Sequence, residues 1–158
     1  MDEFQGHASV RVDATPEAVF ELITDVDRLP EWNIAIERVL KRPPELTEGA
    51  EWTIKMHPPR LPSWTSISRV EELDRRHLRF AYETRNGDGN PSYLKWAWHV
   101  TGTDGSAEVT VTWHAYLKTA DRRFFAGPMR KRQLAREVSR SLTTMVSAVS
   151  VPSPGPRR

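Results

Sequence analysis

The stretch Ser-Val-Arg-Val-Asp-Ala-Thr-Pro-Glu-Ala-Val-Phe-Glu-Leu-Ile-Thr-Asp-Val-Asp-Arg-Leu-Pro-Glu-Trp, residues 9–32, decides how the chain folds. Val10 and Val12 alternate with polar residues, which predicts a strand with one buried face. Thr15 is a suitable N-cap, and Pro16 suits the first helical position because its missing N–H would have no partner there. This stretch therefore predicts a strand that runs directly into two short helices.

Six further strands follow along the chain. Alternating apolar and polar residues, bounded by proline-rich or glycine-containing turns, predict them at 36–41, 51–56, 63–73, 77–84, 93–101 and 107–117. The last two strands flank the turn Thr103-Asp104-Gly105-Ser106, in which Asp-Gly is a strong two-residue turn signal. Counting outward from this turn places Trp98 opposite Val111 and Trp96 opposite Trp113, all on one apolar face.

A long helix should end the fold. It is predicted from about Phe125 to Ser150, with a start at Gly127 if Pro128 occupies its first turn. Its apolar stripe recurs at helical spacing and contains Met129, Leu134, Val138, Leu142, Met145, Val146 and Val149. We interpret residues 1–151 as one domain and predict that the proline-rich tail, 152–158, is disordered.

The opening motif carries a family resemblance. The runs Val-Asp-Ala-Thr-Pro-Glu-Ala-Val-Phe and Asp-Val-Asp-Arg-Leu-Pro-Glu-Trp resemble the start of the START-like (SRPBCC) helix-grip superfamily. Within it, the chain most resembles the branch labelled polyketide cyclase/dehydrase and lipid transport, from Ser9 to about Val149. The resemblance implies an α+β helix-grip fold: a seven-stranded bent antiparallel sheet around a long C-terminal helix, with two short helices after the first strand and an apolar cavity. It does not fix the function, because the superfamily contains enzymes, carriers and receptors.

Large apolar side chains on the concave face and on the last helix are the candidate ligand-binding residues. Binding pockets are mostly apolar and often aromatic, and the resemblance points to the same face. The predicted cavity wall consists of Trp32, Phe80, Tyr82, Trp96, Trp98, Val111, Trp113, Met129 and Leu134. The alternative is that these side chains only fill a core between the sheet and the helix.

Arg69 is the candidate polar anchor and catalytic residue. Residues 64–70 resemble the strand of single-domain aromatase/cyclases that carries a cavity arginine, and an inward guanidinium could stabilise an enolate. The same resemblance matches Trp98 to a cavity tryptophan, but it fails at Ile36, where those cyclases have a tyrosine. Strict alternation also places Arg69 on the face opposite Val70, so an inward Arg69 requires a bulge.

Several other kinds of site are not predicted. The chain has no cysteine, its five histidines lack partners at metal-ligand spacing, and no glycine-rich phosphate loop is present. We therefore expect no metal and no cofactor. The net charge of +2 is too small to indicate a nucleic-acid partner. The acidic start and the absence of a long apolar run favour a cytoplasmic protein, and the oligomeric state stays open.

Basic residues gather around the start of the last helix: Arg122, Arg123, Arg130, Lys131, Arg132, Arg136 and Arg140. One interpretation is a solvated outer face. The other is transient contact with an anionic membrane or an acidic protein, where each basic residue contributes about 1 kcal/mol near a lipid surface.

These observations leave three hypotheses for function. The first is binding of a hydrophobic small molecule, such as a polyketide, a lipid or a related aromatic. The second is a polyketide aromatase/cyclase in which Arg69 stabilises an enolate and Tyr82 or Tyr93 moves a proton. The third is a protein-interaction module, which would have a filled cavity and an apolar patch on its outside. On the last helix we expect Val138 and Leu142 to lie in the core and Leu134 to border the cavity.

Overall fold

The computed structural model describes residues 1–150, with side chains described through residue 149. The prediction of a disordered tail at 152–158 lies outside the described residues. Seven antiparallel strands form one sheet in the order β1-β7-β6-β5-β4-β3-β2. The strands are β1 (Glu3–Val12), β2 (Ile36–Lys41), β3 (Glu51–Met56), β4 (Trp64–Asp74), β5 (Arg79–Asn86), β6 (Tyr93–Thr103) and β7 (Ser106–Tyr116). The predicted seven-stranded helix-grip fold is confirmed.

The opening motif folds as its capping residues predict. Thr15 Oγ1 accepts a hydrogen bond from Ala18 N–H at 3.2 Å, which satisfies one of the free donors at the helix start. Helix α1 (Pro16–Thr24) is followed by the 3₁₀ turn η1 (Val26–Arg28) and the short helix α2 (Leu29–Trp32). Two α-helices therefore follow the first strand, as predicted.

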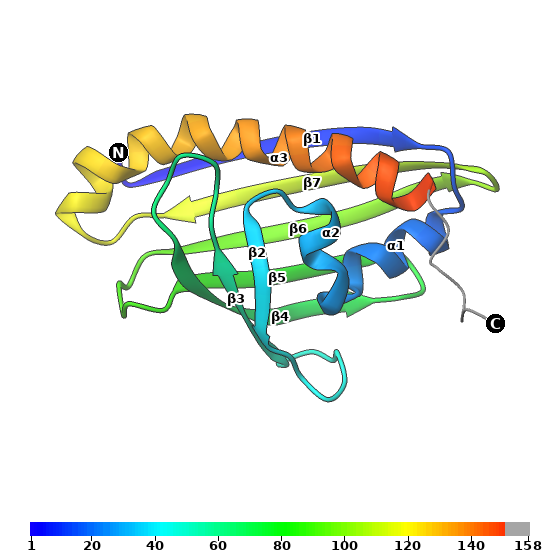
Figure 1. Ribbon diagram of the computed structural model, residues 1–158, viewed down its shortest axis with the longest axis horizontal. Coiled ribbons are helices and arrows are strands. Elements are labelled where there is room, and N and C mark those ends of the chain that lie inside the picture. Colours follow the sequence, from blue (N-terminus) through cyan, green and yellow to red (C-terminus); the bar gives the residue numbers. More distant parts are fainter. Residues whose placement is uncertain (151–158) are drawn as a thin grey trace.

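The long C-terminal helix α3 (Gly127–Ser150) runs along the sheet next to β1, with α1 and α2 beside its C-terminal half (Figure 1). A π-helical turn, η2 (Arg122–Ala126), leads into it, so α3 begins at Gly127 as the position of Pro128 indicated. Its buried stripe contains Leu134, Val138, Leu142 and Met145. No helix within residues 1–150 is both long enough and apolar enough to cross a bilayer.

The register of the β6–β7 hairpin agrees with the count from its Asp-Gly turn. Trp98 pairs with Val111, and Trp96 pairs with Trp113. Gly105 has φ of 85°, the left-handed conformation that such a turn requires and that glycine adopts without strain. The predicted hairpin and its apolar concave face are confirmed.

The first strand is longer than the prediction, which recognised it only from Ser9. It begins at Glu3, because β7 is long enough to continue the ladder to the pair Glu3–Tyr116. Gly6 lies opposite Trp113, and a Cβ at this position would stand 2.3 Å from the indole. The absence of a side chain at Gly6 therefore leaves room for the Trp113 ring.

The α3 stripe provides a stability test. Leu142 is 3% exposed and does not line the cavity described below, so Leu142→Ala should lower the free energy of unfolding by about 2–5 kcal/mol. Ser147 lies exposed on the same helix, and Ser147→Ala is the matched control. Urea unfolding measures both variants. Equal stability of Leu142→Ala and the wild type would contradict the packing of α3 on the sheet.

Candidate functional site

A cavity of about 460 Å³ lies between the concave face of the sheet and α3. This volume falls within the range of small-molecule sites. Strands β3 to β6 and helix α3 form most of its wall, and further residues come from the β3–β4 and β5–β6 loops and from β1, α2, the α2–β2 connection and β7. Because exposed residues such as Pro62, Ser63 and Met129 belong to this wall, the cavity opens to solvent at the end of the sheet where α3 begins.

Three aromatic rings, from β3, β5 and β6, form a continuous cavity wall. The Trp52 and Tyr82 ring centroids are 4.9 Å apart in an edge-on contact, and the Tyr82 and Trp96 centroids are 6.4 Å apart with nearly parallel planes. Tyr82 and Trp96 are two of the predicted wall residues. Met129 and Leu134, also predicted, line the cavity from α3.

The other predicted wall residues do not line this cavity. Trp32, Phe80, Trp98, Val111 and Trp113 are all buried in the core. Trp32 on α2 packs edge-on against Trp98 with ring centroids 5.4 Å apart. The short helices thus fill one end of the concave face, and only the other end stays hollow.

The hydroxyl group of Tyr82 connects the cavity wall with the buried core around Trp98. It accepts a hydrogen bond from Trp98 Nε1–H at 3.1 Å, and burial raises the pKa of Tyr82 to about 12. The phenol therefore keeps its proton at neutral pH. It can donate a hydrogen bond to a ligand, but it is a poor general base.

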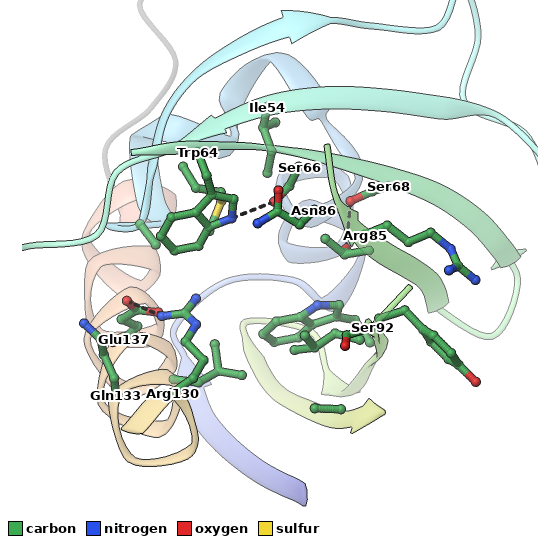
Figure 2. A pocket seen from close by; sticks show the side chains of 18 of the residues that line it. Ile54, Trp64, Ser66, Ser68, Arg85, Asn86, Ser92, Arg130, Gln133 and Glu137 are labelled. Atoms are coloured by element: carbon green, nitrogen blue, oxygen red, sulfur yellow. Dashed lines mark hydrogen bonds and ion pairs between the residues drawn. The ribbon is translucent and has the colours of Figure 1, made fainter. Parts of the chain in front are cut away.

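A strip of hydroxyl groups lies on β4 and β5 beside the aromatic wall. Ser66 accepts a hydrogen bond from Trp64 Nε1–H at 3.1 Å, and the hydroxyl oxygens of Ser68 and Thr84 are 2.8 Å apart. Ser66, Ser68 and Thr84 all line the cavity, and Figure 2 shows Ser66 and Ser68 on its wall. They give an otherwise apolar site a few polar groups that could orient a ligand.

The structure contradicts the inward placement of Arg69. Arg69 is exposed, whereas its neighbours Ser68 and Val70 are buried. On the outer face it pairs in register with Glu51 on β3 and Glu83 on β5, which are favourable cross-strand neighbours. A register shift does occur in β4, but only between residues 70 and 72, after Arg69. It therefore cannot turn this side chain into the cavity.

Another arginine reaches the cavity wall from α3. Arg130 Nη1 lies 2.8 Å from both carboxylate oxygens of Glu137, and its guanidinium carbon stands 5.2 Å from the centre of the Trp64 ring. Glu137 is buried and Arg130 is partly buried. Figure 2 shows Arg130 and Glu137 side by side on α3, across the cavity from Ser66 and Ser68 of β4. The ion pair and the cation–π contact together fix the guanidinium at this position.

Sequence reasoning missed several of these wall residues. The alternation of residues 51–56 already placed Trp52 on the same face as Ile54, so Trp52 could have been included. Trp64 could have been included as well, because it lies six residues before Val70 on the same strand, and residues an even number apart share a face. Arg130 was counted only as part of the basic cluster, although it lies four residues before Leu134 and seven before Glu137, on one helix face.

Within residues 1–149, no group of three or more His, Asp or Glu side chains is arranged to hold a metal ion. The charged residues that line the cavity are the Arg130–Glu137 pair and, at its edge, Arg85 and Arg122. Arg122 forms an ion pair with Asp88, and Arg85 forms one with Glu83. The cavity interior therefore offers hydrogen-bonding groups and aromatic rings.

Residues 4–150 match the family described as polyketide cyclase / dehydrase and lipid transport. The chain belongs to this family. No curated protein matches the chain.

Solved structures of other proteins resemble this chain over nearly its whole length. Protein TTHA0849 from Thermus thermophilus has a TM-score of 0.73 at 14% identity, with 93% of this chain and 97% of that one covered. Ara h 8.0201 has a TM-score of 0.69 at 11% identity, covering 94% and 98%. The di-domain ARO/CYC StfQ from the steffimycin biosynthetic pathway has a TM-score of 0.75 at 12% identity, covering 94% of this chain and 51% of that one. At these identities the likeness shows a shared fold.

The raised pKa of Tyr82 predicts a pH-dependent contribution to stability. The folded protein keeps this proton until about pH 12, whereas the unfolded chain loses it near the ordinary value of 10.0. The contribution of Tyr82 is therefore complete below pH 10 and is lost as the pH rises to 12. Tyr82→Phe should cost about 1–2 kcal/mol near neutral pH, since Trp98 N–H loses its acceptor. Denaturant unfolding of both proteins should show this difference shrinking above pH 10, and a constant difference would contradict it.

The Arg130–Glu137 pair predicts a strongly non-additive double mutant. Arg130→Met leaves a buried carboxylate without its partner and should lower the free energy of unfolding by about 3 kcal/mol. Adding Glu137→Gln should restore most of that loss, because the uncompensated charge is removed. Urea unfolding of the two single variants and the double variant measures the coupling. Additive effects would mean that the two side chains do not interact in solution.

Proposed function

We propose that this protein binds a hydrophobic small molecule, such as a polyketide, a lipid or a related aromatic, in the cavity between the sheet and α3. One observation carries the proposal. The concave face is hollow only at one end, and the hollow combines a continuous aromatic wall with a separate strip of hydroxyl groups. A core that served only to stabilise the fold would be filled, because protein interiors are close-packed.

The wall indicates which ligand shape and polarity would fit. Trp52, Tyr82 and Trp96 offer ring faces and edges to flat apolar groups. Ser68 and Thr84 offer hydroxyl groups to a few ligand oxygens. Glu137 balances the charge of Arg130, so the cavity interior does not favour a multiply charged ligand. A flat, mostly apolar molecule with a few oxygen atoms satisfies all three features.

The hollow cavity and the outward position of Arg69 count against the other two hypotheses. An enolate-stabilising role for Arg69 fails because this side chain lies on the outer face. Of the two tyrosines proposed to move a proton, Tyr82 has a pKa of about 12, and the Tyr93 ring packs against Arg85 and Tyr116. A protein-interaction module would have a filled cavity, whereas the cavity of this protein measures about 460 Å³.

The cytoplasmic location stays a prediction from the sequence.

A cavity-filling substitution tests the proposal. Leu134 is buried and lines the cavity from α3, so Leu134→Trp should occupy part of the space that a ligand needs. Ile67 is exposed on the outer face of β4, and Ile67→Trp is the matched control. With N-phenyl-1-naphthylamine as a fluorescent apolar probe, Leu134→Trp should weaken binding at least about tenfold, whereas Ile67→Trp should not change it.

The same titration identifies the ligand class by competition. Planar polyketide-like aromatics and single-chain lipids are added to the probe complex, and thermal melts verify that each variant is folded. Saturable displacement by one class that depends on the Leu134 position would support the proposal. If neither the probe nor any competitor binds saturably to folded wild-type protein, the proposal is wrong.

A further inference from the structure

Three large apolar side chains project into solvent where α3 begins. Phe124, Phe125 and Met129 are 68%, 73% and 71% exposed, which makes them the most exposed large hydrophobic residues among residues 1–149. The others, Met1, Leu40 and Ile67, are 40–43% exposed. Phe124 and Phe125 lie in η2, and Met129 follows in the first turn of α3. We call these three residues, Phe124, Phe125 and Met129, the apolar tip.

An arginine row continues from the apolar tip along the outer face of α3. Arg132, Arg136 and Arg140 are spaced four residues apart, so their side chains follow one line along the helix. All three are exposed, on the side of α3 away from the buried stripe. They border a surface groove between α3 and the β3–β4 loop, and Arg60 of that loop borders it as well.

The basic cluster that stood out in the sequence divides into two sets. Three of its members have acidic partners: Arg122 with Asp88, Arg123 with Asp2, and Arg130 with Glu137. Within residues 1–149, no ion pair involves the other four members, Lys131 and the arginine row, or Arg60. The row is thus a concentrated positive charge that is not neutralised within the described part of the chain.

We propose that the apolar tip and the arginine row together dock this protein on an anionic membrane surface. Phenylalanine and methionine side chains lower their free energy by leaving water for the boundary between headgroups and acyl chains. Arginine side chains beside them can reach lipid phosphates, with which they form strong charge-assisted hydrogen bonds. An acidic protein would complement the row, but it would not by itself account for two adjacent phenylalanines at 68% and 73% exposure.

The cavity opens next to this docking surface. Leu61, Met129, Gln133 and Glu137 line both the cavity and the groove that the arginine row borders. A docked molecule would therefore hold its cavity entrance near the bilayer, where an apolar ligand is most concentrated. Direct ligand exchange with the bilayer rests on the proposed function, whereas the docking itself does not.

Vesicle co-sedimentation tests the docking. The full chain is mixed with vesicles of phosphatidylcholine alone or with about 30 mol% phosphatidylglycerol. Binding is expected only to the anionic vesicles and should weaken as salt is raised from about 0.1 M to about 1 M. Arg132→Gln with Arg136→Gln should weaken it about 30-fold, as expected for the loss of two basic residues near an anionic surface. Phe124→Ser with Phe125→Ser should weaken it at least about tenfold, with less dependence on salt.

Matched controls use the opposite end of the sheet and its outer face. Arg75→Gln with Arg76→Gln removes the same charge from the exposed β4–β5 turn, and Leu40→Ser with Ile67→Ser removes two exposed apolar side chains elsewhere. Both control variants should bind anionic vesicles like the wild type. All variants change exposed residues, and thermal melts verify that each one is folded.

Three results would overturn the docking proposal. The first is no binding of folded wild-type protein to anionic vesicles. The second is an equal loss of binding in the Arg75/Arg76 control, which would indicate unspecific attraction of a basic protein. The third is binding to soluble polyglutamate but not to vesicles, with the same dependence on the arginine row, which would indicate an acidic protein as the partner. Since no cavity ligand is used, failure here leaves the ligand-binding test unaffected.

Discussion

The contact between Trp32 and Trp98 determines which part of the concave face is filled by side chains and which part is left as a cavity. Trp32 ends α2 and is 1% exposed, and its ring meets Trp98 of β6 at 5.4 Å. This contact holds the two short helices on one end of the concave face. Helix α3 then covers the length of the sheet but cannot fill the other end, because no short helix lies beneath it there (Figure 1). The cavity is thus a consequence of where the opening motif packs.

The same packing explains how much of the site could be predicted. The Asp-Gly turn fixed the cross-strand partners of Trp96 and Trp98, because the turn sets the register of a hairpin, and both rings share a face because they are two residues apart. It could not tell that Trp96 borders a cavity while Trp98 lies under α2, since both point to the same side. Which half of a concave face is covered depends on contacts between distant segments, and periodicity carries no information about them.

Two further residues show different limits of sequence reasoning. Arg69 could have been placed correctly, because strict alternation opposed it to Val70; the family resemblance favoured the wrong side. Gly6 could not have been interpreted, because its role depends on the Trp113 ring that lies over it. The fold was predictable from local patterns, whereas the detailed shape of the site depended on pairs of residues that lie far apart in the sequence.

The charges of α3 connect the cavity with the surface. Arg130 points to the cavity side, where Glu137 and Trp64 balance and hold it, so desolvation of the guanidinium is offset locally. The arginine row, on the outer face of the same helix, lacks such partners within the described residues and stays hydrated. A single helix thereby presents a neutralised arginine to an apolar interior and charged arginines to the exterior. Because the groove that the row borders shares Leu61, Gln133 and Glu137 with the cavity, a partner that binds the row would come close to the cavity entrance.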